Sequence, residues 1–556
     1  MEISYSGGDG IVLGNSKQAI LQNSSISHVN WSGIFSQANS DQITISHNDI
    51  ADIGDGAYGK GKTFAGIDCN SANSTVAYNK IVRTGYSGII SAGVNNLIKR
   101  NVIDSVVLLL NDNGGIYTNN NINKTNGTLI EENIITNSIG EYLGAPVASL
   151  ASGIYLDNLS EGITVSKNTV AFVNGYGLYG HLLQGGNKFY DNTSFQSVLS
   201  EMRLHVPAVV PEMDVRGNIM VTNDPAVTHN VLLGNLADYT YAEIGLFRDN
   251  YVINPFNHKT IRFNYKEGST SPNIRYNSVY EWEAAAAQIT GTVASPLKYP
   301  SGTTPSDVIK FYYNPSNTSQ GFTLPAGSFI DVKNQPYCGT ITLAPYSSAV
   351  LLKVSALSCI TPESCGMPQN IVVSATSDTT AALSWDTVAN AINYDVRYKG
   401  SGDADWKYNH NIFGTSVLLI NLDPEKTYGY QVRSSCYGTE SDWVTVENNA
   451  NAAVAAIQTK PKHLSPIASE ARLTAYPNPF KKQTTIAFNL PLTQDKVTLD
   501  LYNLMGSRLQ RLFEGKAHAG QPYNFEFDRK ILSAGVYFIR LTAAQTVKHF
   551  KIIITD

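Results

Sequence analysis

The 556-residue sequence contains no apolar run of about eighteen residues, the length that a helix needs to cross a membrane. Charge of either sign is also scarce: 40 Lys and Arg stand against 45 Asp and Glu, which gives a net charge of −5. No basic segment stands out, so the sequence lacks the phosphate-neutralising surface that nucleic-acid binding requires. We therefore expect no transmembrane helix and no polynucleotide partner.

Cysteine is scarce as well, and a signal peptide is missing. The first residues, MEISYSGGDGIVL, lack the basic start, apolar centre and small-residue cleavage site of such a peptide. Four of the five cysteines lie in the second half of the chain, where they allow two pairs. We expect the disulfides Cys365–Cys436 and Cys338–Cys359, with Cys69 as a buried thiol.

Small, polar and aromatic residues are plentiful instead. The chain has 44 Gly and 31 Tyr together with many Asn, Ser and Thr, whereas charged residues make up 15%. This composition suits short strands and tight turns better than long surface helices. At roughly 150 residues per domain, the length predicts about four domains. We expect an all-β protein.

Asn recurs in the pattern apolar-x-x-Asn-x-apolar through the first half of the chain. The copies are Asn48, Asn79, Asn101, Asn133, Asn168, Asn218, Asn250 and Asn277, with Asn23 and Asn192 as looser ones. Asn at a turn tolerates left-handed dihedral angles and can bond the Asn above and below it. The recurrence therefore predicts a structural ladder of Asn side chains.

A second element, Gly followed by an aliphatic residue, lies between these Asn residues. The aliphatic members are Ile34, Ile67, Ile89, Ile116, Ile154 and Leu178. Two short strands per repeat predict the coils of a parallel β-helix, in which each strand pairs with the same strand of the next coil about 4.8 Å away. We assign residues 1–285 to this β-helix, with the aliphatic residues as an inward column.

If the first residue after each repeat's Gly points inward, the second and fourth residues after that Gly point outward, because side chains alternate along a strand. Tyr117, Tyr155 and Tyr179 then share one outward column, and Asn119, Asp157 and His181 share the other. An elongated platform of stacked rings beside polar groups suits a sugar, whose apolar faces lie on rings and whose hydroxyls bond polar groups. The alternative is an aromatic stack that only stiffens the solenoid.

Two segments of this region resemble a known family. The stretches DNGGIY (112–117) and GIYLD (153–157) are similar to the paired D-x-G-x-I-Y and G-I-Y-L-D motifs of secreted right-handed β-helix glycoside hydrolases of the family 141 type, over roughly residues 60–280. The resemblance implies fucosidase or xylanase activity, with Asp112 and Asp157 as the signature carboxylates. His181 matches part of the family's His-rich stretch, and Arg203 lies in the segment that corresponds to its Arg-containing one. The upstream coils of such enzymes are missing here, so we expect that the first coils and a signal peptide have been lost.

Glycosidic cleavage requires paired carboxylates: one acid protonates the leaving oxygen, and the other acts as nucleophile or activates water. We expect Asp112 and Asp157 to be this pair and leave retaining or inverting cleavage open. The expected substrate-binding residues are Tyr117, Asn119, Tyr155, Tyr179, His181 and Arg203. Glu141, Glu161, Asp68 and Glu201 are weaker candidates for a carboxylate role, and no metal ion or cofactor is expected.

Two other functions remain open at this point. A β-helix lyase needs a basic proton acceptor, often with Ca²⁺ held by acidic side chains. Lys and Arg residues such as Lys80 and Lys99 lie beside the Asn turns instead, which disfavours a lyase. A non-catalytic glycan-binding or adhesive solenoid is the other alternative, because a fold does not fix a function.

The second half of the chain predicts smaller β domains. Residues 286–357 alternate strands with Pro and Gly turns, which is typical of a small β-sandwich, and their last strands resemble the sandwiches that trail secreted glycoside hydrolases. Residues 365–458 carry Trp385 and the stretch LDPEKTYGYQVR (422–433), which resemble the marks of fibronectin type III domains. There we expect Trp385 and Tyr428 to be core and corner residues of a spacer.

The C-terminal segment contains a linker followed by two distinctive motifs. Residues 459–470 form a polar linker, and beyond it stand YPNPF (476–480) and SAGVYFIRL (533–541). These phrases are similar to the C-terminal sorting domain of the type IX secretion system, which we assign to residues 471–556. The resemblance implies a Bacteroidota-type cell, the type IX machinery as a partner, and a secreted or outer-membrane surface location.

Overall fold

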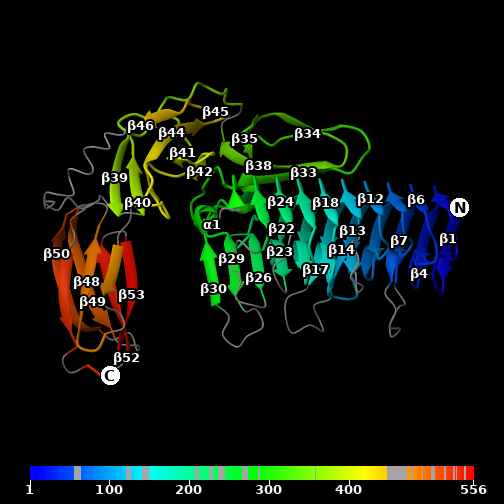
Figure 1. Cartoon of the computed structure of the whole chain (residues 1–556), viewed down its shortest axis with the longest axis horizontal. Helices are drawn as coiled ribbons and strands as arrows, with labels where there is room; N and C mark the ends of the chain where they lie inside the picture. Colours follow the sequence, from blue (N-terminus) through cyan, green and yellow to red (C-terminus); the bar gives the residue numbers. More distant parts are fainter. Residues whose placement is uncertain are drawn as a thin grey trace. The chain divides into compact units, whose positions relative to one another are not determined.

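The computed structural model describes two compact units, residues 1–448 and 449–556. The structure describes all residues of these units except 55–63, 120–126, 141–149, 207–211, 225–228, 236–243, 266–272, 286–288, 357–358, 378, 447–471, 477–479, 491–492, 503–507, 519–520, 522, 530–531, 534, 544–545 and 556. Both units are nearly all β, and the first begins with long parallel sheets (Figure 1). The expected all-β parallel β-helix followed by sandwiches is confirmed.

Three sheets form the coils of the β-helix, and each coil contributes one strand to every sheet. The first sheet contains β1 (Glu2–Ser6), β4 (Ser25–Val29), β7 (Asp49–Ile53), β10 (Lys80–Thr84), β13 (Val102–Val106), β16 (Ile134–Ser138), β19 (Thr169–Val173), β22 (Thr193–Ser197), β25 (Ile219–Val221), β28 (Tyr251–Ile253) and β32 (Val293–Ala294). The second contains β2 (Ile11–Leu13), β5 (Ile34–Ser36), β8 (Ala65–Cys69), β11 (Ser87–Ser91), β14 (Asn113–Asn119), β17 (Ala151–Asp157), β20 (Tyr176–His181), β23 (Ser200–Val206), β26 (Val231–Asn235), β29 (Ile261–Tyr265) and the antiparallel β30 (Asn273–Asn277). The third contains β3 (Ile20–Gln22), β6 (Thr44–Ser46), β9 (Thr75–Ala77), β12 (Leu97–Lys99), β15 (Leu129–Glu131), β18 (Thr164–Ser166), β21 (Lys188–Tyr190), β24 (Asp214–Arg216), β27 (Leu246–Arg248) and β31 (Ile289–Thr290).

The inward column lies where the Gly repeats place it. Ile34, Ile67, Ile89, Ile116, Ile154 and Leu178 pair across successive strands and are fully buried. The Gly before each of them allows the coils to pack closely: a Cβ on Gly153 would lie 2.1 Å from Val170 Cγ1 and 2.7 Å from the Gly177 carbonyl oxygen. Any side chain there would force the first and second sheets apart.

The Asn ladder is confirmed, with a correction to its geometry. Each Asn amide donates to the Asn of the next coil at 2.9–3.0 Å, from Asn48 through to Asn250. The left-handed conformation belongs to the residue before the Asn, such as Tyr78 at φ 59° or Arg100 at φ 53°, and not to the Asn itself. Asn23 is such a preceding residue, and the buried Ser24 takes the ladder position. Asn277 is not a ladder member either, because it pairs with Ile261 in the antiparallel β29–β30 hairpin.

Helix α1 (Val279–Ala285) lies at the end of the β-helix. Ser278 and Glu281 form a reciprocal cap: the Ser278 N–H donates to Glu281 Oε2 at 2.8 Å, and the Glu281 N–H donates to Ser278 Oγ at 3.2 Å. Trp282, 1% exposed, packs its ring 5.0 Å from that of Phe247, so the helix covers the last part of the apolar core.

A small sandwich follows and packs on the first sheet. Its elements are α2 (Pro305–Val308), β33 (Ile309–Asn314), β34 (Gln320–Thr323), β35 (Ser328–Asp331), β36 (Pro336–Tyr337), β37 (Thr340–Leu343) and β38 (Ser347–Ser355). Phe311 stacks on Phe195 of the β-helix at 4.5 Å between ring centroids, and buried residues of both domains form one apolar cluster.

Two sheets form the next sandwich. One contains β39 (Val372–Ser377), β40 (Thr380–Ser384) and β43 (Ser416–Leu419), and the other contains β41 (Asn393–Gly400), β42 (Lys407–Ile412), β44 (Tyr428–Cys436), β45 (Thr439–Glu440) and β46 (Val444–Val446). Trp385 is buried, and the hydroxyl of buried Tyr428 accepts from the Asp423 N–H at 2.8 Å, as expected for core and corner residues. The expected disulfides Cys338–Cys359 and Cys365–Cys436 are present, and Cys69 is a buried free thiol.

The second unit is a separate sandwich with its own buried core. One sheet contains β47 (Arg472–Tyr476), β48 (Gln483–Asn489) and β51 (Tyr523–Asp528). The other contains β49 (Gln494–Tyr502), β50 (Arg508–Ala517), β52 (Gly535–Ala543) and β53 (Thr546–Ile554).

Candidate carbohydrate site

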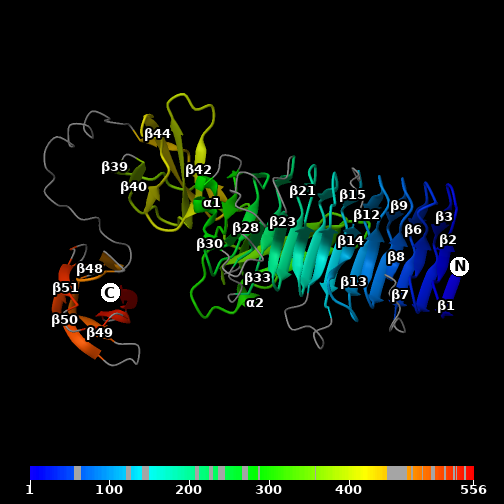
Figure 2. The same cartoon turned by 60° about the horizontal axis from the view of Figure 1, so that its bottom comes forward.

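The second sheet brings the sequence-predicted residues into line, and Figure 2 labels its strands β8, β14 and β23 along the coils. Tyr117, Tyr155 and Tyr179 are paired in register on β14, β17 and β20. Asn119 pairs with Asp157 one coil on. The two outward columns deduced from the Gly repeats therefore exist as continuous rows.

Asp157 is the centre of a hydrogen-bond network at the end of β17. Its Oδ2 accepts from the Tyr117 hydroxyl at 2.7 Å, and its Oδ1 lies 2.9 Å from His181 Nδ1. The Asn158 N–H donates to Oδ1 at 2.8 Å, and the Asn119 amide donates to the Tyr117 hydroxyl at 3.0 Å. Burial opposes ionisation of Asp157, but these donors outweigh it and hold its pKa below the ordinary value. Asp157 is therefore a carboxylate at neutral pH.

Asp112 lies at the bend before β14, with φ at 58°. Its Oδ1 accepts from the Tyr155 hydroxyl at 3.3 Å. The residue as a whole is exposed, yet burial of its carboxyl, and then repulsion from Asp157, raise its pKa. The pKa values of the two carboxyls are thus displaced in opposite directions, which is the arrangement that separates a proton donor from an ionised partner.

The tyrosine row is packed more tightly than an open platform. Tyr155 and Tyr179 stack at 4.3 Å and are only 2% and 3% exposed, in a cluster with Tyr176 and Leu232. The expectation that three rings offer their faces to a sugar is therefore wrong for these two, because other outward side chains cover them. Tyr117 is half-buried, as are three polar members of the site, Asn119, His181 and Arg203.

Arg203 continues the tyrosine column, since it pairs with Tyr179. Its Nη1 donates to the Tyr176 hydroxyl at 2.6 Å, and its guanidinium carbon lies 5.0 and 5.3 Å from the ring centroids of Tyr176 and Tyr179. His205 pairs with His181, and their rings lie 5.0 Å apart. The sequence analysis missed His205, although its place two residues after Arg203 put it in the fourth-position column.

The weaker carboxylate candidates that the structure describes are not part of the network around Asp157. Asp68 belongs to the same outward column two coils before Tyr117; it is 5% exposed, accepts from the Asn70 amide at 2.9 Å, and burial raises its pKa to about 7. Glu201 is fully buried and bonded to Ser194 and Ser197, so it points into the β-helix and away from the site. Glu161 is a half-buried residue between β17 and β18, and Glu141 lies outside the described residues.

Lys and Arg side chains beside the Asn turns form ion pairs with acidic residues that do not belong to the second sheet. Lys99 bonds Glu131 at 2.6 Å, Arg100 bonds Glu132 at 2.8 Å and Arg83 bonds Asp52 at 2.6 Å. None of these three therefore serves as a base at the carboxylate site. Among the described residues, no group of three or more His, Cys, Asp or Glu is arranged to hold a metal ion.

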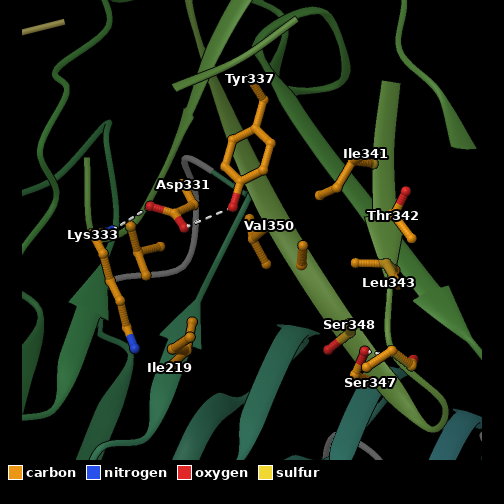
Figure 3. A pocket seen from close by; sticks show the side chains of 13 residues that line it. Ile219, Asp331, Lys333, Tyr337, Ile341, Thr342, Leu343, Ser347, Ser348 and Val350 are labelled. Carbon is orange, nitrogen blue, oxygen red and sulfur yellow. Dashed lines mark hydrogen bonds between the residues drawn. The ribbon is translucent and has the colours of Figure 1, made fainter. Parts of the chain in front are cut away.

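A cavity of about 280 Å³ lies between the β-helix and the small sandwich, far from this chemistry (Figure 3). Asp331 is its one carboxylate. Its Oδ1 accepts from the Lys333 and Gln335 N–H groups at 2.8 and 2.9 Å, and its Oδ2 accepts from the Tyr337 hydroxyl at 3.3 Å. These bonds hold the turn after β35, and the described residues that line the cavity include no pair of carboxyls for catalysis.

Comparison with known proteins assigns the two C-terminal domains. Residues 366–447 match the fibronectin type III domain family, and residues 474–555 match the family described as the secretion system C-terminal sorting domain. The protein is secreted or displayed on the cell surface. Its sorting tail implies interaction with the type IX secretion machinery. Across the described residues, no helix has the length and apolar character needed to pass through a membrane.

No curated protein matches the chain. Among solved structures, the one described as the complex structure of XylC with xylose is 15% identical, with a TM-score of 0.26, and the match covers 37% of this chain and 35% of that one. A two-domain fibronectin type III segment from chicken tenascin is 14% identical, with a TM-score of 0.14, and the match covers 34% of this chain and all of that segment. The chain thus spans about a third of the length of XylC, and these scores assign no activity.

Proposed function

We propose that the β-helix is a glycoside hydrolase that cleaves a plant or algal polysaccharide, or its side chains, with Asp112 and Asp157. The single observation that carries this proposal is the placement of the two carboxyls on paired tyrosines: Tyr155, which bonds Asp112, is in register with Tyr117, which bonds Asp157. Asp112 is the proton donor to the leaving oxygen, because burial of its carboxyl, and then repulsion from ionised Asp157, favour its protonated form. Asp157 is the partner carboxylate, acting as nucleophile or as the base that activates water.

The other site residues have supporting roles in this proposal. His181 and Tyr117 bond Asp157 and hold its carboxylate in place. Tyr155 bonds Asp112, so this buried ring acts as a positioning residue. Half-buried Tyr117 offers ring area to a sugar, and Asn119 offers a carbonyl: its Oδ1 is buried and has no hydrogen-bond partner among the described residues. The sorting domain supports an extracellular polymer as substrate.

Product analysis on a panel of plant and algal polysaccharides tests the proposal. We expect new reducing ends without new ultraviolet absorbance. Unsaturated, ultraviolet-absorbing products that disappear with a chelator would replace the hydrolase with a Ca²⁺-dependent lyase. Binding of a glycan without any product would favour the non-catalytic solenoid.

A further inference from the structure

The fibronectin type III domain lies against the end of the β-helix, within the same compact unit. Its Asn411 amide donates to the Ala294 carbonyl at 2.7 Å, and its Asn421 amide donates to the Ala284 carbonyl at 3.0 Å. Ala294 ends β32, the last strand of the first sheet, and Ala284 lies in the last turn of α1. The last strand of a sheet and the last turn of a helix leave carbonyls without partners in their own element, and the domain supplies a donor to one of each.

Two further contacts fix the domain on this end. The Asn393 amide donates to the Pro296 carbonyl at 2.9 Å in a buried bond, and the Ile420 N–H donates to the Tyr280 hydroxyl at 2.8 Å. The Tyr280 ring also packs against the apolar core of the domain. The domain therefore caps the end of the β-helix, whereas the spacer expected from the sequence would be joined to it only through a linker.

Charged side chains on the outer face of the domain take part in this contact. Tyr394 and Val396 of β41 belong to the domain core, so Asp395 between them points to the outer face. Asp395 is nonetheless only 3% exposed. Its Oδ1 lies 3.3 Å from His410 Nδ1, and its Oδ2 accepts from Arg433 Nη2 at 2.7 Å. Burial opposes the ionisation of Asp395, but His410 and then Arg433 outweigh it and lower its pKa to about 2.

Glu283 of α1 brings a second carboxyl group to His410. Its Oε1 accepts from the Thr292 N–H at 2.7 Å. Burial raises the pKa of Glu283 to about 7, against the opposing effects of that bond and of the His410 charge. Burial disfavours the charge of His410, but Asp395 and then Glu283 outweigh it and raise the pKa of His410. His410 thus interacts with a carboxylate of its own domain and with a carboxyl group at the end of the β-helix.

Other groups face these two residues from several elements. They are Asp249, Tyr280, Tyr398, Tyr408, Arg433 and Glu440. Glu440 pairs with Arg433. When Glu283 and His410 both carry protons, the cations Arg433 and His410 balance the carboxylates of Asp395 and Glu440. Loss of both protons leaves three carboxylates beside one guanidinium in a partly desolvated contact, which is unfavourable.

We propose that this contact is proton-dependent: the fibronectin type III domain caps the β-helix while Glu283 and His410 hold their protons, and the cap loosens when both protons are lost. The proposal goes beyond the proposed hydrolase and does not rest on it. The protein is secreted or displayed on the cell surface, so the contact meets the pH of the surroundings directly.

The sign of the pH effect follows from the two protons. In the capped state Glu283 keeps its proton up to a pH of about 7, whereas its ordinary pKa is 4.5. The capped state therefore loses stability as the pH rises from 4.5 to about 7. His410 contributes stability that is complete below its ordinary pKa of 6.5 and is lost as the pH rises through its raised pKa. Both groups thus weaken the contact as the pH rises.

Hydrogen exchange of the full-length chain, measured by mass spectrometry of its peptides, tests this proposal. The readout is the protection factor of the segments 279–285 and 416–422, corrected for the intrinsic exchange rate at each pH. We expect protection in both segments to fall at least about tenfold between about pH 5.5 and about pH 8.5, since one pKa unit corresponds to a factor of about ten. Protection of the segment 97–106, which belongs to β12 and β13 in a distant coil, should change by much less.

Substitutions then assign the effect to the two residues. Glu283→Gln keeps an acceptor for the Thr292 N–H but cannot titrate, so the fall with pH should become much smaller. His410→Gln removes the positive charge, so protection should be low already at the acidic pH. Glu2→Gln changes an exposed carboxyl of β1 in the first coil and should keep the wild-type response. Asn411→Ala removes one capping bond, so it should lower protection by a similar factor at both pH values.

Three outcomes would overturn the inference. They are equal protection at the two pH values, a fall in Glu283→Gln as large as in the wild type, and an equal fall in the segment 97–106, which would show unfolding of the whole unit. If Glu283→Gln fails to fold, as shown by its melting curve, His410→Gln decides the result, and a wild-type fall in that variant would contradict the proposal. These measurements do not depend on catalysis, so failure of the proposed hydrolase leaves them intact.

Discussion

The Tyr117 hydroxyl donates to Asp157 across two neighbouring coils, at 2.7 Å. This bond joins a residue in the middle of β14 to one at the end of β17, and it exists only because the register places Asn119 beside Asp157. The same stacking that builds the solenoid therefore sets the protonation state of the carboxylate.

Removal of this donor should change the pH dependence of activity. Tyr117→Phe deletes one of the hydrogen bonds that lower the pKa of Asp157. A hydrogen bond to a charged group is worth about 1.5–3 kcal/mol and one pKa unit about 1.4 kcal/mol, so the acidic limb of the pH–rate profile should move up by about one to two units. Tyr190→Phe is the control, because its hydroxyl bonds Asp214 on the third sheet. An unmoved acidic limb in Tyr117→Phe would show that this limb does not report Asp157.

The Asn ladder should be essential to the stability of the β-helix. Asn101 accepts from both the N–H and the amide of Asn79, and its own amide donates to the Val76 carbonyl and to Asn133, all within the core. Asn101→Ala leaves several buried groups without partners, each costing about 1–3 kcal/mol. We expect calorimetry of the full chain to show a markedly lower Tm for the β-helix transition. Asn39→Ala, which removes an exposed bond to the Asn15 N–H, should leave that Tm nearly unchanged; equal effects of the two substitutions would contradict a structural ladder.

Thiol titration should separate the buried free cysteine from the four disulfide-bonded ones. The native protein should expose no reactive thiol, because Cys69 is buried and the other four are paired. Denaturant without reductant should release one thiol, and reductant should release five. Three or more thiols in denaturant alone would mean that at least one of the two disulfides does not form.

Deletion of residues 471–556 should block export in the native host while leaving the rest of the chain folded. The second unit has its own core and contains the sorting-domain match. Export of the shortened chain would show that another segment directs export. Insolubility of the shortened chain made in the cytoplasm would show that the first unit needs the second unit in order to fold.

The periodic part of this structure is the part that the sequence predicts well. In a parallel β-helix, equivalent positions stack directly, so the spacing of Gly and Asn is enough to align Tyr117, Tyr155 and Tyr179. The same logic failed at Asn277, because a hairpin strand runs antiparallel there and leaves the coil path while keeping the local pattern.

Burial and proton affinity could not be predicted from the same spacing. Tyr155 and Tyr179 pack in one cluster with Tyr176, which comes from another position of the repeat, and with Leu232, which lies two coils beyond Tyr179 in the same column. Asp112 reaches Tyr155 from a bend with positive φ before its strand, where period-2 alternation no longer applies. The raised pKa of Asp112 depends on this non-periodic bend, whereas the lowered pKa of Asp157 depends on donors from the neighbouring coils.

The most direct test of the account is the turnover of two charge-deleting variants. Asp112→Asn and Asp157→Asn keep the shape and hydrogen-bonding capacity of the site, and general acid–base catalysis contributes about 10²–10⁴-fold. On a glycan that the wild-type protein cleaves, we predict that either substitution lowers kcat by at least about 10²-fold relative to the wild type. The Tm and the affinity for the glycan should stay nearly unchanged. Cleavage that survives both substitutions at close to the wild-type kcat would contradict the assignment of the carboxylate pair.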